Sequence, residues 1–457
     1  MKNIVLLLAT AIWFYGCTSA NSVIKDQISQ TDLIVADELK SISNQTTQPF
    51  DSITYKDLLN LAIANDPEIK TSNFAKERNL IRKEQVDSEK WPRLYLSTSL
   101  EFPVNGDDWK AKDGISGGLV FEYDLIKSMF NSDFVNFEEI EHQKILAKTR
   151  ASYTSTYKSV LELIADIDNY QTKVKHYKNI LELIDTVITD TEKADKLKGY
   201  ASRNLWGIKS KRNLYQNHIK KARKSLDSTF CKLNILVNAP CGKQFEITDH
   251  TELLNAIDNY AGNKYDLKQI IPAALKTRSD INLSRYNIYL SKLNIRKAQR
   301  NGMPKVSMSL GLGDYETSYN DTETNVLAKL NMSLPVFDFG DTKRKVAIAK
   351  LNHKSQEEKL KVTIRKAITN IQNSYKILNE SYIDSLELKK WIHEIESRNI
   401  SFKKLQQMNK STKNEVLNTE VALQEALIEQ NNIKNIVRKQ AITCLREADI
   451  IIDFTSK

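Results

Sequence analysis

The residue types that could do chemistry occur in this chain, but their spacings do not complete a catalytic or metal site. His393 and Glu394 are adjacent, yet no second histidine follows four residues later, as a helical zinc-protease site requires. Ser401 and Lys404 have the spacing of a Ser-x-x-Lys nucleophile, without the supporting motifs of that enzyme class. No glycine-rich loop has the spacing that a dinucleotide needs. We therefore expect no enzyme activity, no cofactor and no metal site.

Cys17 is the residue whose surroundings point to a defined modification. Lys2 gives the chain a positive start, and a short apolar stretch from Ile4 to Trp13 follows. The segment Phe14-Tyr15-Gly16-Cys17 then places a small residue directly before the cysteine, as in a bacterial lipobox. The apolar stretch is too short to span a membrane, so residues 1–16 are expected to be a signal peptide and Cys17 to carry lipid such as palmitate. The alternative is an ordinary signal peptide cut nearby, with Cys17 incidental.

The other three cysteines bear on disulfide formation, because export would place the chain in an oxidising compartment. Cys231 and Cys241 are ten residues apart around a predicted helix end, so a disulfide between them is an open alternative. Cys444 is distant in sequence and is expected to pack as a small apolar side chain.

The composition favours long helices. The 457 residues include only 13 glycines and 8 prolines, which is well below the usual share of these two helix-interrupting residues. No run of about 18 apolar residues occurs, which excludes a protein that spans a membrane by helices. The net charge of +10 is spread along the chain, with basic and acidic residues interleaved as on solvated helix faces, so we expect no nucleic-acid binding.

The sequence is internally duplicated, with a repeat of about 210 residues. The aligned pairs of segments are Asp66–Ile69 with Arg278–Ile281, Trp91-Pro92 with Met303-Pro304, and Tyr123–Leu125 with Phe337–Phe339. Each half also contains a run of apolar residues with a mean spacing of about 3.5, which is the period of a coiled coil. The two runs share one phase, so we expect one helical architecture that occurs twice.

The expected helix lengths indicate an elongated molecule. In each half, two short helices together are nearly as long as one long helix, so the short pair can stack end to end beside it. The expected helices are 57–90, 134–198 and 202–235 in the first half, and 268–301, 341–408 and 412–446 in the second. At 1.5 Å per residue each long helix reaches about 100 Å, which suits a tube or an elongated bundle.

Two pairs of alternating segments lie between the helices and predict four barrel strands. Apolar and polar residues alternate with period two in the predicted hairpins 93–123 and 305–335, as in strands with lipid outside and water inside. The residues expected to face lipid are Leu96, Leu100, Leu119, Phe121, Met308, Leu310, Leu330 and Met332. Four strands cannot close a barrel that needs about eight, so the chain would have to associate with copies of itself. The alternative is an amphipathic sheet packed on a soluble core.

Taken together, these features resemble the TolC or outer-membrane efflux protein family, including its lipidated branch, over roughly 55–450. The segment Leu334-Pro335-Val336-Phe337-Asp338-Phe339-Gly340 matches the strand-to-helix motif in the second half of that family. The helix turn from Asn409 to Asn418 also matches, with Asn409 where the family tends to have glycine and Glu415-Val416-Leu417 after a polar run. Gly199 occupies the corresponding turn of the first half.

The resemblance implies a mainly α fold with a small β part. Long coiled helices would form a periplasmic α-barrel, and four strands per chain would contribute to a twelve-stranded outer-membrane β-barrel in a homotrimer. The implied function is a passive exit duct of a tripartite efflux or type I secretion system, with a periplasmic adaptor and an inner-membrane pump as partners. The expected segments are 1–16 signal peptide, 17–54 lipid anchor and tether, 55–236 first repeat, 237–267 equatorial connector, 268–447 second repeat, and 448–457 tail.

The resemblance also assigns the periplasmic entrance to the helix tips. Family members line the constriction with two aspartates, and the motif alignment puts Glu415 at the first position and Asn418 at the second. The asparagine removes one charge per subunit, so a strongly cation-selective entrance does not follow. Lys410 or Lys413 could pair with an acid across the subunit boundary and hold the entrance shut. The alternative is that Glu415 is a solvated helix residue.

Two other classes of protein remain open. One is a lipid-anchored periplasmic scaffold or adaptor without a barrel, against which the alternating segments and the matched helix lengths argue. The other is a lipid-anchored enzyme on a helical frame, for which the sequence offers no site. Drugs, metal ions, amphiphiles and polypeptides all remain open as the substrate of a duct.

Overall fold

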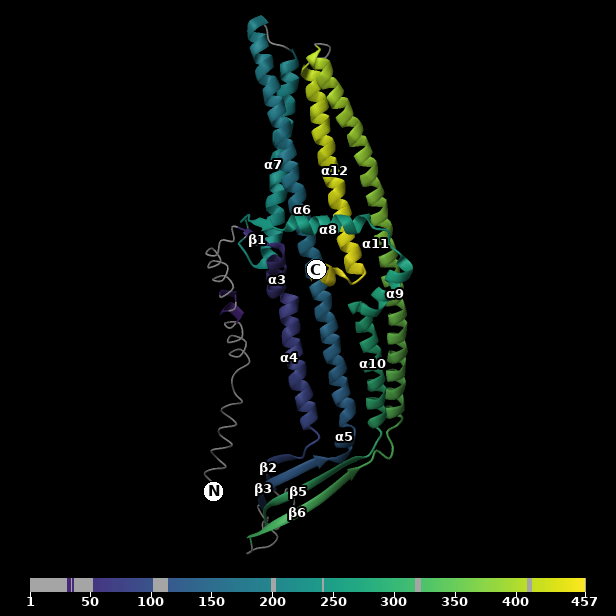
Figure 1. Ribbon diagram of the computed structural model, residues 1–457. Helices are drawn as coiled ribbons and strands as arrows, with labels where there is room; N and C mark the ends of the chain where they lie inside the picture. The colour runs from purple at the N-terminus through teal and green to yellow at the C-terminus, as the bar shows by residue number, and fades with distance from the viewer. Residues whose placement is uncertain are drawn as a thin grey trace.

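The computed structural model describes residues 31–33, 35–36, 52–101, 114–198, 203–240, 242–316, 322–408 and 413–456. The molecule is elongated, with a small sheet at one end, the tips of long helices at the other, and helix α8 crossing the long helices between them (Figure 1). None of the helices in these ranges combines the length and the apolar composition that a membrane crossing requires.

The first repeat follows a short strand, β1 (Ser52–Thr54). Its elements are α3 (Tyr55–Asn65), α4 (Pro67–Ser88), β2 (Arg93–Glu101), β3 (Gly114–Asp124), α5 (Leu125–Met129), α6 (Asn131–Lys198) and α7 (Arg203–Val237). A connection that contains β4 (Glu246–Thr248) and α8 (His250–Gly262) leads to the second repeat.

The second repeat has the same order of elements apart from the short helix after the hairpin. It consists of α9 (Leu267–Thr277), α10 (Ser279–Arg300), β5 (Lys305–Glu316), β6 (Thr322–Ser333), α11 (Asp341–Gln407) and α12 (Lys413–Glu447). The described chain then ends with α13 (Ile451–Ser456). Each repeat has one long helix: α6 contains 68 residues and α11 contains 67. At 1.5 Å per residue, each is about 100 Å long.

The prediction of one continuous short helix at the start of each repeat is wrong. The predicted helix 57–90 is interrupted at Asp66, whose carboxylate accepts hydrogen bonds from the backbone N–H of Glu68 at 2.8 Å and caps α4. Pro67 follows at the first position of α4, where its missing N–H removes no helical bond. The predicted helix 268–301 is likewise interrupted at Arg278, which has an extended conformation between α9 and α10.

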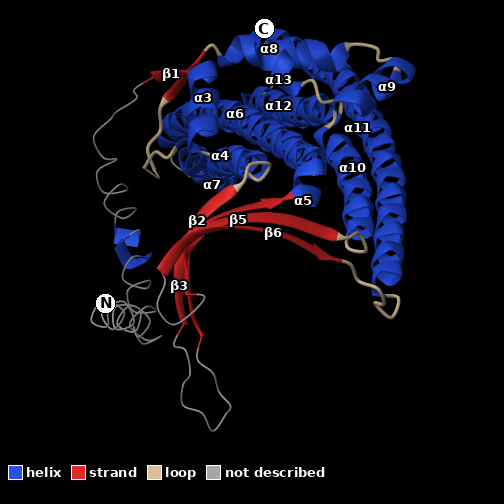
Figure 2. Cartoon of the chain, turned by 90° about the horizontal axis from the view of Figure 1, so that it is seen from below, coloured by secondary structure: helices blue, strands red, loops and turns tan. Residues whose placement is uncertain are grey.

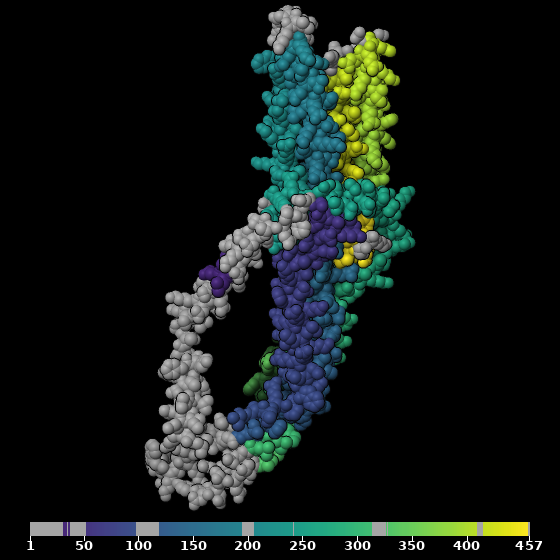
Figure 3. Space-filling view, turned by 60° about the vertical axis from the view of Figure 1, so that its left-hand side comes forward, coloured from purple at the N-terminus to yellow at the C-terminus, as the bar shows by residue number. Residues whose placement is uncertain are grey.

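The two long helices α6 and α11 run through both halves of the molecule. On the strand side of α8 the helices lie in the order α4, α6, α10, α11, and on the tip side in the order α7, α6, α12, α11 (Figure 1). The outermost helices are therefore α4 or α7 along one side and α11 along the other. The space-filling view shows α4 uncovered along its side of the strand-proximal half (Figure 3).

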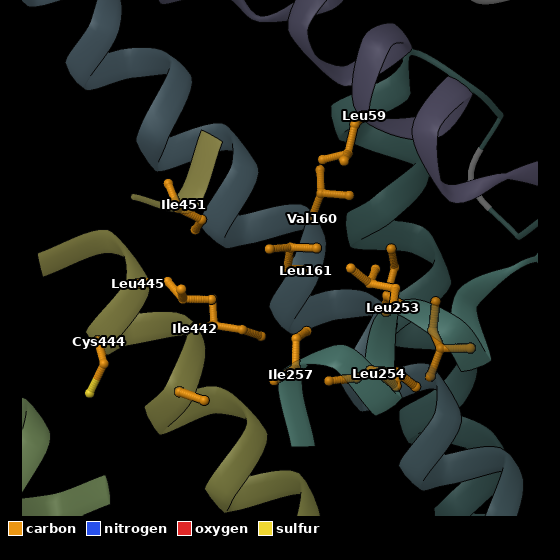
Figure 4. Close-up of a cluster of buried hydrophobic side chains, with 14 of the residues drawn as sticks. Leu59, Val160, Leu161, Leu253, Leu254, Ile257, Ile442, Cys444, Leu445 and Ile451 are labelled. Carbon is orange, nitrogen blue, oxygen red and sulfur yellow. The ribbon is translucent and has the colours of Figure 1, made fainter. Parts of the chain in front are cut away.

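The main hydrophobic core lies at the level of α8. Figure 4 shows apolar side chains of α6, α8 and α12 converging there, among them Leu161, Leu254, Ile257 and Leu445. All four are at most 2 % exposed, and full burial of such a side chain stabilises the fold by about 1.5–3 kcal/mol. Since β1 pairs with β4 at the same level, this core ties the N-terminal strand, the connector and the C-terminal helices together.

The sheet at the far end has four antiparallel strands in the order β2-β3-β5-β6. Each repeat supplies one hairpin, and β3 and β5 join the two hairpins. Seen along the long axis, the sheet is curved and lies across the end of the helices (Figure 2). The duplication therefore produces one continuous sheet within the chain.

Candidate functional site

The two faces of the curved sheet differ in chemistry, and the strand register determines which residues share a face. Residues directly opposite each other on neighbouring strands lie on the same face. One such row across all four strands is Leu94, Phe121, Leu310 and Ala328, and the next is Leu96, Leu119, Leu312 and Val326. The sheet therefore has one apolar face.

The residues predicted to face lipid lie on this apolar face. Leu96, Leu119, Phe121, Met308, Leu310, Leu330 and Met332 are all exposed in the single chain, from 36 % for Leu310 to 72 % for Leu96. Leu100 has the same strand parity, but its side chain lies outside the described residues. An apolar face that no helix of the chain covers needs an apolar environment from outside the chain.

The opposite face of the sheet is polar next to the helices, whereas its row farther from them consists of Tyr95, Val120, Gly311 and Leu327. Arg93, Glu122, Ser309 and Lys329 form one row across the four strands, and Asp124, Ser307 and Asn331 form part of the next. This alternation across the sheet is what a wall between an apolar and an aqueous phase requires. Within the described residues, β2 and β6 each pair on one side only, so both edges of the wall are open to pairing with another chain.

The helix tips at the other end form a second candidate site. Asn418 on α12 accepts a hydrogen bond from the Lys211 ammonium of α7 at 3.0 Å. Glu415 is exposed near the start of the same helix. Gly199, Asn409 and Lys410 lie outside the described residues, as does the side chain of Lys413, so the lysine latch expected there stays a prediction. Lys211, which the sequence did not single out, is one lysine that contacts this region, and Lys403 of α11 is another, at 2.7 Å from Glu420.

A buried contact reinforces the link between the two helix pairs below the tips. The Tyr215 hydroxyl of α7 donates a 2.6 Å hydrogen bond to the Glu425 carboxylate of α12. The side chain of Tyr215 is only 5 % exposed, and burial together with this carboxylate raises the pKa of Tyr215. His176 of α6 is 2.7 Å from Gln424 Oε1 on the same stretch of α12. Polar contacts from both α6 and α7 therefore hold α12 in place at this level.

A charged cluster fixes α8 across the long helices. The Arg438 guanidinium of α12 donates to both carboxylate oxygens of Asp258 on α8, at 2.8 and 2.9 Å, and to Asp168 on α6 at 2.6 Å. Arg438 is 4 % exposed, so burial alone would lower its pKa, but the two carboxylates outweigh burial and raise it. Lys439 adds an ion pair to Asp166 at 2.6 Å. The interleaved charges predicted to lie on solvated faces are, at this level, a buried clamp between three helices.

A second buried cluster lies where α12 ends. Arg278, in the break between α9 and α10, donates to the Glu447 carboxylate at 2.8 Å and to Asp280 at 2.8 Å. Asp449 follows α12 in a left-handed conformation with φ 59° and is 3.1 Å from the Arg150 guanidinium of α6. Burial raises the pKa of Asp449, and Arg150 opposes that shift. The cluster joins the two repeats at the break in the second one.

The candidates for chemistry are not assembled into a catalytic site in the described part of the chain. The Ser401 hydroxyl donates to the backbone carbonyl of Ser397 at 2.9 Å within the same helix, and the side chain of His393 is 83 % exposed. Among the described residues, no group of three histidine, cysteine or acidic side chains is arranged to hold a metal ion. The described residues instead form an amphipathic sheet joined to a long helical body.

The cysteines behave differently from one another. Cys444 is free and buried in the main core, as a small apolar residue would be. Cys231 is disulfide-bonded, whereas Cys241 lies outside the described residues, so their pairing stays a prediction. Cys17 also lies outside the described residues.

Comparison with known proteins agrees with this arrangement. The sequence profile of the family described as outer membrane efflux protein matches residues 270–443. No curated protein is significantly similar to the chain in sequence. The match confirms the family resemblance that the strand-to-helix motif and the helix turn had indicated.

Several solved structures share the fold. CusC is 16 % identical with a TM-score of 0.69, over 87 % of this chain and 92 % of CusC. The Campylobacter jejuni CmeC outer membrane channel is 14 % identical with a TM-score of 0.69, over 86 % of this chain and 85 % of CmeC. The Vibrio cholerae outer membrane protein VceC is 14 % identical with a TM-score of 0.70, over 86 % of this chain and 95 % of VceC. At such low identity the likeness establishes the fold, and it confirms the predicted class of long helices with a small β part.

Proposed function

We propose that this chain, whose residues 270–443 belong to the outer membrane efflux protein family, is one subunit of a trimeric exit duct in a bacterial outer membrane. The observation that carries the proposal is the amphipathic four-stranded sheet with two open edges at the end of helices about 100 Å long. Such a sheet is stable in lipid only if its edges are paired. Three copies supply twelve strands, which exceeds the number of about eight that a closed barrel needs.

The outer sides of the helical body support association into a tube. Large apolar side chains are exposed on the outermost helices, where a monomer would leave them in water. They are Phe74 and Ile81 on α4, Trp206 on α7, and Ile348 and Leu351 on α11. Contact of α11 in one copy with α4 and α7 in the next would bury them and continue the wall of the β-barrel as a wall of helices.

The proposed duct moves substrates without chemistry of its own. Its β-barrel crosses the outer membrane, its helices extend into the periplasm, and an inner-membrane pump with a periplasmic adaptor delivers substrate to the helix tips. CmeC and MtrE, which share the fold, are described as outer membrane channels, in agreement with this role. The polar face of the sheet, with Arg93, Glu122 and Lys329, would line the aqueous lumen.

The helix tips are the proposed periplasmic entrance. Convergence of three copies would bring three Glu415 side chains near the axis and concentrate negative charge there, which raises the local concentration of cations. The contacts of Asn418 with Lys211 and of Tyr215 with Glu425 hold the tip helices together within one subunit. Glu415→Gln should reduce the cation preference of single channels, and an unchanged preference would make Glu415 a solvated helix residue.

Lipidation of Cys17 is the proposed anchor of the mature N-terminus. The short apolar stretch and the small residue before the cysteine support it. In Cys17→Ser, incorporation of labelled palmitate should be lost and a longer precursor should remain. Normal labelling of that variant would refute the anchor, whereas barrel assembly is expected to proceed without it.

Heat-modifiable migration tests the proposed trimer. Protein extracted from outer membranes in mild detergent should migrate at the trimer position on a denaturing gel when unboiled and at the monomer position after boiling. A periplasmic scaffold without a barrel would migrate as the monomer under both conditions. It would also be released from membranes when its lipid anchor is removed. That second result would refute the duct.

A further inference from the structure

The segment Leu334–Gly340 carries four exposed apolar side chains between β6 and α11. Leu334 is 51 % exposed, Val336 is 90 %, Phe337 is 74 % and Phe339 is 78 %. We call this segment the rim arm. The rings of Phe337 and Phe339 meet edge to face with centroids 4.5 Å apart, so they present one aromatic surface.

The rim arm is held in a defined shape. The Asp338 carboxylate accepts hydrogen bonds from the backbone N–H groups of Gly340 and Thr342, both at 2.9 Å. The side-chain and backbone bonds from Thr342, with that from Gly340, lower the pKa of Asp338 to about 2. Phe339 has a φ of 50°, in the left-handed region that a bulky residue rarely adopts. A strained backbone that keeps aromatic rings exposed indicates a partner that is absent from the single chain.

The duplication identifies where that partner lies. Inside the chain, β3 of the first repeat pairs with β5 of the second. In the repeat, β6 corresponds to β3, and β2 corresponds to β5. The seam between β3 and β5 within one chain is therefore the counterpart of a seam between β6 of one copy and β2 of the next.

The hairpin registers give the equivalent positions. Arg93 pairs with Glu122 in the first hairpin, and Lys305 pairs with Ser333 in the second. Arg93 and Lys305 are therefore counterparts, and so are Glu122 and Ser333. The second repeat then has three more residues, Leu334–Val336, before its aromatic-Asp-aromatic step.

These equivalences transfer the register to the seam between copies. Because Tyr123 pairs with Met308 inside the chain, Leu334 should lie opposite Leu96 of the partner subunit. The ladder inside the chain ends one pair later, at Asp124 with Ser307, so the transferred register ends at Pro335 with Tyr95 of the partner subunit. Phe339 and Trp91 of the partner subunit each lie five residues beyond the Leu334–Leu96 pair, where the two chains leave the seam.

We propose that the rim arm clasps the partner subunit where the barrel meets the helices, with Leu334 opposite Leu96 of the partner subunit and the Phe337–Phe339 pair against Trp91 of the partner subunit. This inference rests on the proposed trimer and names the contact that closes it. The partner is a second copy of this chain.

The exposure and the parity of the residues support the clasp. Leu96 is 72 % exposed and Trp91 is 65 % exposed in the single chain, so both have surface free for contact. Trp91 also borders an apolar pocket of about 450 Å³ whose lining includes Phe121 and Leu310, so it stands beside the apolar face. The transferred register sets apolar-face residues of β6 opposite apolar-face residues of β2. The apolar band therefore continues across the seam without a shift, whereas a one-residue slip would invert it.

Cysteine cross-linking tests the register. The double variant Leu334→Cys with Leu96→Cys places thiols on directly opposed residues of the transferred register, within the distance that a disulfide spans. In one chain these positions lie at opposite edges of the sheet, so a disulfide can form only between copies. After oxidation, boiled and unreduced samples should run mainly as covalent trimers and return to monomers on reduction. The matched control, Leu334→Cys with Tyr95→Cys, directs the second thiol to the other face and should leave mainly monomer.

The same preparations are first run unboiled, which separates this inference from the proposed function. If unboiled trimers form but the control pair cross-links better than the Leu96 pair, the register is wrong and the duct stands. If neither pair cross-links within intact trimers, the clasp is refuted. If no trimer forms in any variant, including the parent protein, both the clasp and the duct fail.

Two further variants test the aromatic contact without cysteines. Phe339→Gly relieves the strain of the left-handed backbone at this position. If Phe339 acted only within its own subunit, the variant would therefore be as stable as the parent protein or more stable. The clasp predicts instead that trimers of Phe339→Gly and of Trp91→Ala dissociate at lower temperature in unboiled gels. The double variant should lose no more than the larger single loss, because both changes remove one contact. Additive losses would refute the contact.

Discussion

Tyr215 and Glu425 show how two residues distant in sequence can join two helices of one subunit. They are 210 positions apart, and no local pattern in the sequence pairs them. Tyr215 fits the apolar face of α7, and only the packing of α7 on α6 beside α12 brings its hydroxyl to a carboxylate. The sequence could therefore predict the helices of the tip but not the contact that binds them.

Removal of this hydroxyl should loosen the tip. A hydrogen bond to a charged group contributes about 1.5–3 kcal/mol, so Tyr215→Phe should lower the free energy of unfolding by roughly that amount. In single-channel recordings the variant should also open more often. Tyr289→Phe, at a 57 % exposed position on α10, is the control and should change neither quantity. Equal losses in both variants would contradict the assigned role.

Asp449 should contribute a pH dependence to stability. Burial raises the pKa of Asp449 above its ordinary value of 3.8, so the folded chain holds this proton more tightly than the unfolded chain. Its contribution to the free energy of unfolding is then largest below pH 3.8 and is lost as pH rises through the raised pKa. Asp449→Asn removes the titration, and asparagine tolerates the left-handed backbone at this position.

Chemical unfolding of both proteins across the acidic range tests this sign. The parent protein should lose more stability than Asp449→Asn as pH rises from 3.8 toward neutrality. The same slope in both proteins would mean that Asp449 does not titrate differently on folding.

At the scale of elements, the sequence predicted the long helices closely and the interruptions poorly. The ends of α6 and α11 lie within three residues of the predicted ones, because heptad periodicity and turn residues mark them. The break before α4 had a visible signal in Asp66-Pro67, a cap followed by proline. The break at Arg278 has no cap followed by proline, and its signal in the sequence is the alignment of Arg278–Ile281 with Asp66–Ile69 in the repeat.

The clamp on α8 should be the most costly set of charges to disturb. Arg438→Ala removes a 5 % exposed side chain from Asp258 and Asp168, whose side chains are 23 % and 25 % exposed. Because solvent reaches both carboxylates and Lys434 still pairs with Asp258, the loss should exceed that of an exposed pair but stay below the cost of about 3–5 kcal/mol for a fully buried pair. Lys434→Ala is the control, because Lys434 contacts the same Asp258 but is 47 % exposed, and an exposed pair contributes about 0–1 kcal/mol. Unfolding by denaturant measures both, and similar losses would contradict the clamp.

The sheet faces can be tested with adjacent residues on one strand. Leu310 lies on the apolar face of β5 and Ser309 on the polar face. An arginine near the bilayer midplane costs about 2–4 kcal/mol on the lipid side, so Leu310→Arg should reduce the yield of unboiled trimers, whereas Ser309→Arg should not. Equal yields from both variants would mean that the assignment of faces is wrong.

For the whole molecule, duplication was the most informative pattern in the sequence. It predicted two helical repeats and two hairpins, and the structure has both. It did not reveal that the hairpins join through β3 and β5, because strand pairing across 190 residues leaves no local mark. The same pairing shows how one chain should meet the next, since an open β6 faces outward at one edge and an open β2 at the other.

Single-channel recording in planar lipid bilayers tests the central claim most directly. Trimer purified in detergent should insert and give discrete conductance steps, and the Leu310→Arg preparation should give few insertions at equal protein concentration. The matched Ser309→Arg preparation should insert as often as the parent protein. If the parent trimer, confirmed by its shift on boiling, gives no conductance steps even when Tyr215→Phe loosens its tips, the chain is not a duct.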